Sequence, residues 1–140
     1  AFSHRCVENG LSPNAPHIRE LEKHGFHYIL SVKEGDHKYL FEQVALARQE
    51  GRTTEFEQRE GDVQHCFSFI NQMPLNKSNP DVLVNFIEYW EIRKGKTQHF
   101  CWVTDFTITT LNAFTIMRGA KKDVSYSFTI DLKKLKLNKE

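Results

Sequence analysis

Apolar residues recur with two different periods along this 140-residue chain, and the change of period divides it into predicted elements. Residues 14–24 place Ile18 and Leu21 on one narrow helical face, and Gly25 follows as a stop signal. Residues 26–32 are apolar on both faces, which is typical of a covered strand in the middle of a sheet. The first part of the chain is therefore predicted to contain a helix followed by a central strand.

A second helix is predicted over residues 37–50, where apolar positions form a broad face, with Asp36 as its cap and Gly51 at its end. The period then changes to two. Strands are predicted over residues 53–59, 63–72, 82–93 and 97–104. The stretch 74–80, rich in Asn, Ser and Pro, is predicted to be a loop, and 94–96 a hairpin turn. Four successive strands with short turns predict an antiparallel meander.

The last third of the chain changes character twice. A third helix is predicted over residues 110–120, with Thr109 as its cap and an inward face made of Leu111, Phe114, Ile116 and Met117. Residues 124–132 then alternate strictly between apolar and polar side chains, which is a strand period. The stretch from residue 118 onward carries seven basic residues against three acidic ones, so it has a local excess of positive charge.

The turn around Asn9 is where this pattern predicts chemistry. A short strand is expected to end there, and a polar turn leads into a helix whose first amides Asn14 can cap. Residues 1–35 are thus expected to form a βαβ unit with parallel strands. Ligands of α/β proteins gather beyond the carboxyl ends of strands, so Asn9 is a candidate site residue.

Composition narrows the class of protein. A hydrophobic fraction of 39% with eleven Phe is typical of a globular domain, and no run of 18 apolar residues exists to cross a membrane. Three cysteines without a CxxC pair predict reduced thiols and a cytoplasmic location. A net charge of +1 does not decide whether nucleic acid is a partner, because a local basic surface is enough.

Histidine and cysteine are the usual ligands of a zinc site, so their spacing along the chain can indicate one. His17, His24, His27 and His37 cluster early in the chain, and His99 lies two residues before Cys101. None of these spacings matches a zinc pattern, and no cysteine pair supports one. No metal site is predicted from them, and Cys66 and Cys101 are expected to be small core residues.

Four segments carry a resemblance to a known family. They are residues 8–18 (ENGLSPNAPHI), 26–41 (FHYILSVKEGDHKYLF), 100–106 (FCWVTDF) and 109–120, and together they cover most of residues 7–120. In order and spacing they resemble the DDE transposases of bacterial insertion sequences. The single motifs are not unique to that family, but their succession is fairly specific.

The resemblance implies an α/β (mixed α+β) fold, namely an RNase H-like catalytic-core fragment with an antiparallel β-meander inserted before the last helix. Such enzymes hold two Mg²⁺ ions with two Asp and one Glu, and they cut and rejoin DNA. Negative oxygen ligands are needed because two close divalent ions repel. One partial domain is implied over 1–140, divided into a core βαβ unit (1–35), a helix plus β-rich insertion (36–105), the start of the last catalytic helix (106–120) and a diverged basic tail (121–140).

The family's three carboxylates are not matched in this chain. The first Asp would precede Ala1, and Asn9 stands at the position of the second. Asparagine removes a charge and one oxygen ligand, so no Mg²⁺ is expected to bind here. After Ala120 the family's Trp and Glu–Asn motif is missing. One hypothesis is that the tail is read out of frame, which would explain why the helical period gives way to a strand period there. The chain is therefore expected to be a catalytically incomplete fragment.

A non-catalytic DNA-binding or protein-interaction module is the alternative interpretation. It would contact the phosphate backbone of duplex DNA, with Lys121, Lys122, Lys133 and Lys134 as DNA-binding candidates, and with Lys136 and Lys139 in the same tail. Trp90 and Trp102 are its candidate aromatic contacts. A solvated tail and cross-strand packing are the competing interpretations of these lysines and tryptophans.

Overall fold

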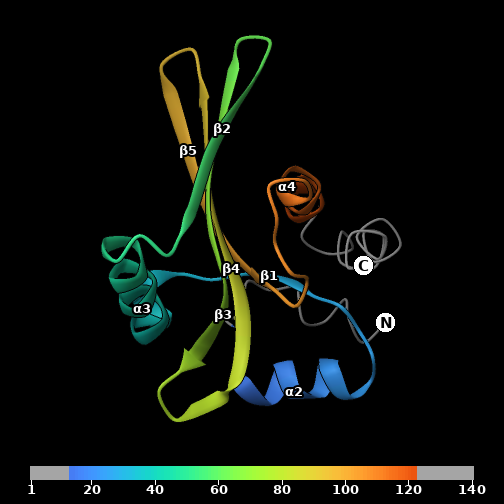
Figure 1. Cartoon of the computed structure of the whole chain (residues 1–140). Helices are drawn as coiled ribbons and strands as arrows, with labels where there is room; N and C mark the ends of the chain where they lie inside the picture. Colours follow the sequence, from blue (N-terminus) through green and yellow to red (C-terminus); the bar gives the residue numbers. More distant parts are fainter. Residues whose placement is uncertain (1–12, 123–140) are drawn as a thin grey trace.

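The structure is a computed structural model that describes residues 13–122, with the backbone alone for Lys122. Three α-helices and five strands form this part of the chain, together with a short 3-10 helix (Figure 1). In chain order the elements are α2 (Ala15–Lys23), β1 (Ile29–Ser31), η2 (Glu34–Asp36), α3 (Lys38–Gln49), β2 (Thr54–Glu60), β3 (Val63–Asn76), β4 (Asn79–Arg93), β5 (Lys96–Thr104) and α4 (Ala113–Lys122). None of the helices between residues 13 and 122 is long and apolar enough to cross a bilayer.

The five strands form one antiparallel sheet in the order β1-β5-β4-β3-β2. The predicted meander is confirmed, because each strand from β2 to β5 pairs with the next along the chain. β1 joins the meander through β5, with Ile29 opposite Thr104. The fold of the described residues is thus mixed α+β. The parallel strand predicted around Asn9 lies outside the described residues.

Each face of the sheet carries its own core, because neighbouring residues on a strand point to opposite faces. Phe86 packs with α2 and α3 in one cluster, whereas the next residue, Ile87, packs with α4 in the other. The same division separates Val103 from Trp102. In Figure 1, α3 and α4 accordingly lie on opposite sides of the sheet.

The outer ends of the two hairpins, β2–β3 and β4–β5, project beyond the helices (Figure 1). The β4–β5 turn is formed by Lys94 and Gly95, whose φ angles are 50° and 80°. Two successive positive φ values are those of the tight turn that suits a twisted hairpin, so the predicted turn at 94–96 is confirmed.

The predicted loop over residues 74–80 is wrong. β3 continues to Asn76 and β4 begins at Asn79, so that Pro74 lies opposite Leu83. The strands tolerate the proline because their register shifts between Ile70 and Met73 and again after Pro74. The turn is closed by Asn76, whose side-chain oxygen accepts the Asn79 N–H at 2.9 Å.

The helix ends agree with the sequence in some places and differ in others. Asn14 caps α2 as predicted, since its Oδ1 accepts the His17 N–H at 2.9 Å. Gly25 and Gly51 follow α2 and α3 with φ of 74° and 73°, as expected for helix stops. Asp36 is not the cap of α3; it ends η2, and His37 takes the cap position without a side-chain hydrogen bond.

α4 begins three residues later than predicted. The Thr109 hydroxyl accepts the N–H groups of Leu111 and Asn112 at 3.2 Å, but these belong to a turn that precedes the helix. Leu111 therefore does not face inward as expected, and 91% of its surface is exposed. Ile116 and Met117 are buried as expected.

Candidate functional site

The structure describes only some of the residues that the sequence singled out. Asn9, Lys133 and Lys134 lie outside residues 13–122, and only the backbone of Lys122, the last residue of α4, is described. Lys121 is placed. Its Nζ lies 2.6 Å from Glu91 Oε1, and it also lies over the rings of Tyr89 and Phe100. Its charge is therefore balanced within the fold, and a role in DNA binding stays a prediction.

Lys121 belongs to a polar network on the α4 face of the sheet. The Tyr89 hydroxyl donates to Glu91 at 2.8 Å and lies 2.6 Å from His65 Nδ1. Glu91 is only 8% exposed. The hydrogen bond from Lys121, with further help from Tyr89, lowers the pKa of Glu91 to about 2 despite its burial. These contacts attach α4 to the middle of the sheet.

A second polar contact joins segments far apart in the chain. His27 Nδ1 lies 2.7 Å from Asp105 Oδ2, and the Tyr28 N–H donates to Asp105 Oδ1 at 2.9 Å. The His27 ring also stacks on Phe106, with centroids 4.7 Å apart. Asp105 thus fixes the residues before β1 to the end of β5, at the point where the chain leaves for α4.

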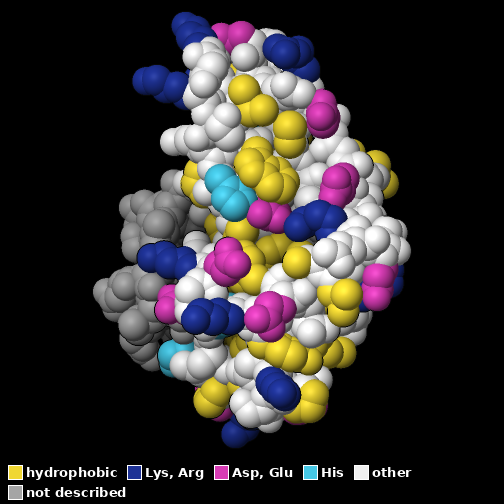
Figure 2. All heavy atoms as spheres, turned by 90° about the vertical axis from the view of Figure 1, so that its left-hand side faces the viewer, with side chains coloured by type: hydrophobic (Ala, Val, Ile, Leu, Met, Phe, Trp, Pro, Cys, Tyr) yellow, Lys and Arg dark blue, Asp and Glu magenta, His cyan; other side chains and the backbone are white. Residues whose placement is uncertain are grey.

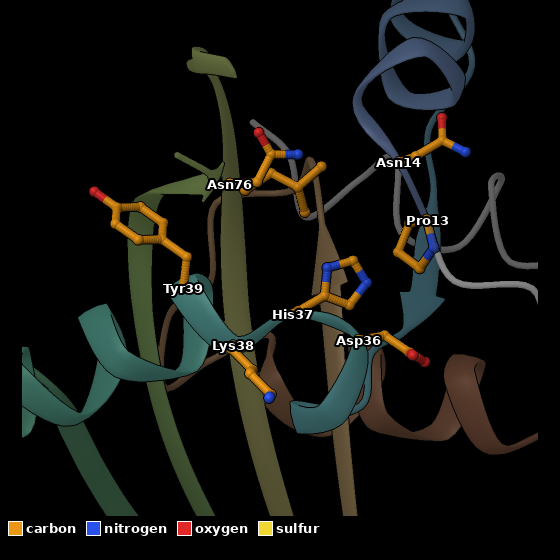
Figure 3. Close-up of a pocket in the computed structure, with 8 residues that line it drawn as sticks. Pro13, Asn14, Asp36, His37, Lys38, Tyr39 and Asn76 are labelled. Carbon is orange, nitrogen blue, oxygen red and sulfur yellow. The ribbon is translucent and has the colours of Figure 1, made fainter. Parts of the chain in front are cut away.

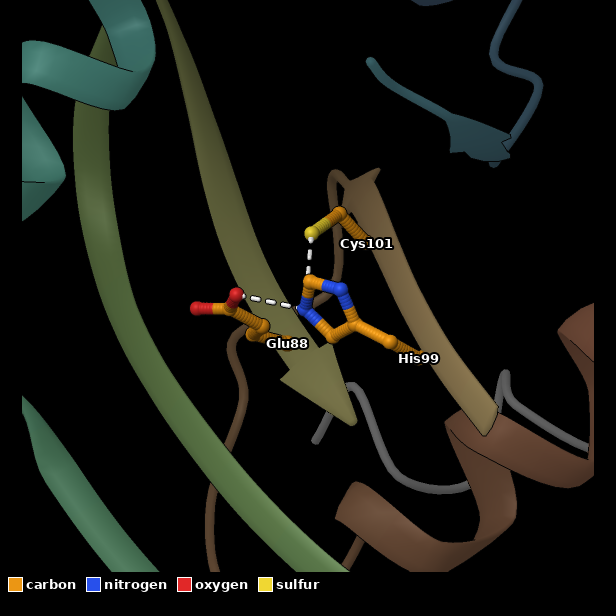
Figure 4. A group of neighbouring side chains, drawn as sticks. All are labelled: Glu88, His99 and Cys101. Carbon is orange, nitrogen blue, oxygen red and sulfur yellow. Dashed lines mark hydrogen bonds and ion pairs between the residues drawn. The ribbon is translucent and has the colours of Figure 1, made fainter. Parts of the chain in front are cut away.

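The third cluster is one of candidate metal ligands. Glu88 on β4 and His99 and Cys101 on β5 bring their side chains together on the α3 face of the sheet (Figure 4). His99 Nε2 lies 2.6 Å from Glu88 Oε2 and 3.8 Å from Cys101 Sγ. Burial, with the Glu88 charge adding to it, raises the pKa of the Cys101 thiol to about 12, so the thiol is protonated at neutral pH.

Arg48, near the end of α3, adds a positive charge beside this cluster. Its guanidinium donates to Glu88 Oε1 at 3.0 Å, to the Ser68 hydroxyl at 3.0 Å and to Glu55 at 3.2 Å. Acidic and basic side chains are interspersed over this face rather than gathered by sign (Figure 2). The described residues of this face therefore form no broad basic surface for a phosphate backbone.

A hollow of about 510 Å³ lies between the start of the described chain and the start of α3 (Figure 3). Its lining comprises Pro13, Asn14, Asp36, His37, Lys38, Tyr39, Leu75 and Asn76. His37 Nε2 is buried there without a hydrogen-bond partner among the described residues, and burial lowers the pKa of this imidazole. Asp36 is the only carboxylate among the described residues that line the hollow, so they do not form a two-metal site there.

Comparisons of the chain with protein-family models, with curated proteins and with solved structures find no match.

The cluster of Glu88, His99 and Cys101 was not predicted from the sequence. The two-residue spacing of His99 and Cys101 was visible, and on a strand it places both side chains on one face. The missing information was the register of β4 against β5, which puts Glu88 opposite Cys101. Cys101 is partly buried, as is Cys66, so neither is a fully enclosed core residue.

Proposed function

We propose that this chain is a fragment of a DDE-type transposase and is catalytically incomplete by itself. The proposal rests first on the resemblance of residues 8–18, 26–41, 100–106 and 109–120 to that family. In the intact family the activity is Mg²⁺-dependent strand cleavage and transfer. This chain has Asn9 where a metal-binding Asp is expected, and its residues after Ala120 do not match the family's Glu motif.

The observation that carries the proposal is that α4 packs against β1. A long β-rich segment separates the two in sequence, yet Ile29 of β1 shares a buried cluster with Ile116 and Met117 of α4. A transposase with an insertion before its last catalytic helix requires this arrangement, because that helix must reach the core strands to deliver its carboxylate. Under this proposal, the meander between α3 and α4 corresponds to the insertion.

Two described carboxylates, Asp105 and Glu91, do not replace the missing ligands. Asp105 lies near the start of β1, but its two oxygens are engaged by His27 and the Tyr28 N–H. Glu91 is bound by Lys121. Mg²⁺ prefers several oxygen ligands with open positions for water and phosphate, and neither carboxylate offers that. The proposed fragment therefore lacks the chemistry of the intact family.

The coding DNA on both sides of this chain tests the family assignment. We expect an upstream segment in the same frame that ends in an Asp-bearing strand. Downstream of the codon for Ala120, we expect a shifted frame that encodes the Trp and Glu–Asn motif. Flanking DNA with neither feature would overturn the assignment.

Plasmid nicking tests the catalytic part of the proposal. Supercoiled plasmid is incubated with the chain and Mg²⁺ or Mn²⁺, and the fraction of relaxed plasmid is quantified by gel electrophoresis. We expect no nicking by the wild type or by the Asn9→Asp variant, because one restored carboxylate does not hold two metal ions. Nicking by the wild type that disappears in Asn9→Ala would show that the site is active.

One observation favours a non-catalytic DNA-binding module as the second candidate. The β4–β5 turn carries Arg93, Lys94 and Lys96 without an acidic residue between them, and all three are exposed at the end of a projecting hairpin (Figure 1). Arg93 is paired with Glu91, whereas Lys94 and Lys96 have no ion pair within residues 13–122. Two such cations could contact phosphates.

Salt-dependent binding to duplex DNA tests this candidate. Each phosphate contact contributes about 0.9 to the slope of log K against log salt concentration, so the Lys94→Glu/Lys96→Glu double variant should lower the slope by about 2. The matched control is Lys33→Glu/Lys38→Glu, which changes charge equally at exposed lysines elsewhere. Equal loss of binding in both double variants, or no binding at low salt, would reject the module.

A further inference from the structure

Three metal-ligating side chains converge because of the strand register. Glu88 lies directly opposite Cys101 in the β4–β5 pairing, and His99 lies two residues from Cys101 on the same strand. Side chains alternate between faces along a strand, so all three point to the α3 face of the sheet. Their ligand atoms all lie within 4.8 Å of one another (Figure 4).

Two of the ligand–ligand distances, Glu88–His99 and His99–Cys101, differ by less than about 1 Å from those of a tetrahedral zinc site. Zinc bonds of about 2.0–2.1 Å to nitrogen and oxygen and about 2.3 Å to sulfur place the ligand atoms about 3.3–3.6 Å apart. The separation of His99 Nε2 from Cys101 Sγ is 3.8 Å, which needs only a small closure. The Glu88–His99 pair, at 2.6 Å, must open by about 0.7 Å to admit the ion between them.

The surroundings hold Glu88 and His99 in place and leave His99 partly open to solvent. Arg48 engages Glu88 through Oε1, which leaves Oε2 directed toward His99. The His99 ring stacks on Trp90, with centroids 5.0 Å apart and planes 14° apart. In metal sites, neighbouring residues such as Arg48 and Trp90 orient the side chains that bind the ion. His99 is 48% exposed, so an ion can enter from solvent.

We propose that Glu88, His99 and Cys101 bind one Zn²⁺ ion, with the fourth position open to water. A thiolate, an imidazole and a carboxylate together select a borderline-soft divalent ion and not Mg²⁺. The site is separate from the chemistry of the proposed transposase family. It would bridge β4 and β5 on the α3 face of the sheet.

Binding requires that Cys101 lose its proton to solvent as the Zn–S bond forms, so affinity rises with pH. Without metal, the same three groups form a histidine–carboxylate hydrogen bond beside a protonated thiol. Spectroscopy can distinguish the two states, because only the metal-bound state contains a metal–thiolate bond.

Cobalt spectroscopy of the full chain tests the site. Co²⁺ replaces Zn²⁺ and reports a thiolate ligand through an ultraviolet charge-transfer band and tetrahedral geometry through visible bands. We expect both bands to saturate at one equivalent and to disappear when Zn²⁺ is added. Cys101→Ser should remove the charge-transfer band, and His99→Gln and Glu88→Gln should each weaken binding by about 100-fold or more. Cys66→Ser, the matched control on β3, should leave the spectrum unchanged.

Alkylation of the wild type keeps the test valid if a variant fails to fold. Iodoacetamide modification is mapped by peptide mass with and without Zn²⁺, and we expect Zn²⁺ to slow modification of Cys101 at least 10-fold while Cys66 is unaffected. No cobalt thiolate band in the folded wild type would overturn the proposal. A band that survives in Cys101→Ser, or Zn²⁺ protection of Cys66 equal to that of Cys101, would overturn it as well.

Discussion

His27 Nδ1 and Asp105 Oδ2 lie 2.7 Å apart although the two residues are 78 positions apart in the chain. The same carboxylate accepts the Tyr28 N–H through its other oxygen at 2.9 Å. Only 13% of the Asp105 side chain is exposed. The Asp105 carboxylate therefore accepts from two donors at the junction of β1 and β5. It holds the chain in place where β5 ends and the segment leading to α4 begins.

Replacing Asp105 by Ala should lower the free energy of unfolding by roughly 1–3 kcal/mol, because the Tyr28 N–H loses its acceptor in a buried position. Asp105→Asn should cost less, since its amide oxygen can still accept that N–H. The midpoints of urea unfolding measure both changes. Equal losses in the two variants would show that the negative charge, and not the acceptor, is what matters.

Tyr28 should tolerate loss of its hydroxyl. Tyr28 is fully buried, and its hydroxyl has no hydrogen-bond partner among the described residues. Burial, with the charges of Asp105 and Glu22 adding to it, raises the pKa of this phenol. Tyr28→Phe should therefore leave stability unchanged or raise it by up to about 1 kcal/mol, because it removes from the core a polar group that has no hydrogen-bond partner within residues 13–122.

Tyr89→Phe is the matched control for that variant. The Tyr89 hydroxyl contacts both His65 and Glu91, so its removal should destabilise by roughly 1–3 kcal/mol. Urea unfolding of the two variants under one set of conditions makes the comparison. A larger loss in Tyr28→Phe than in Tyr89→Phe would contradict the hydrogen-bonding pattern.

Acid should weaken the fold through Glu91. The pKa of this carboxyl is lowered from 4.5 to about 2 in the folded chain, chiefly by the Lys121 hydrogen bond. A lowered pKa contributes stability above the unfolded value, and that contribution is lost as pH falls from about 4.5 toward 2. The loss is at most roughly 3 kcal/mol. Unfolding midpoints measured across this range should fall steeply in the wild type and less in Glu91→Gln.

Asn71 should be important for the segment that leads to α4. Its side-chain oxygen accepts the Ile108 N–H at 2.9 Å, and its amide donates to the Ile108 carbonyl at 3.0 Å. Asn71→Ala leaves both backbone groups without this partner, so it should cost roughly 1–3 kcal/mol. Leu111→Ser, in the same segment, should change stability by less than about 0.5 kcal/mol, because its side chain is exposed. Thermal unfolding compares the two.

Local signals account for the elements that the sequence predicted well. Asn14 was predicted to cap a helix because its side-chain oxygen can accept a free N–H of the first helical turn. It does cap α2. The alternation of Val63, His65, Phe67 and Phe69 predicted one buried strand face, and all four are buried. Local signals failed at Pro74, where two register shifts let a proline remain within a strand.

The sequence by itself determined the order of helices and strands, the antiparallel meander and the burial of alternating positions, because periodicity and turn residues act over a few neighbours. Only the tertiary structure decided which side chains meet. The contact of His27 with Asp105 depends on β1 pairing with β5, and the cluster of Glu88, His99 and Cys101 depends on the register of β4 against β5. A shift of one residue would turn every side chain of a strand to the other face, and packing of the whole sheet against its helices selects the register.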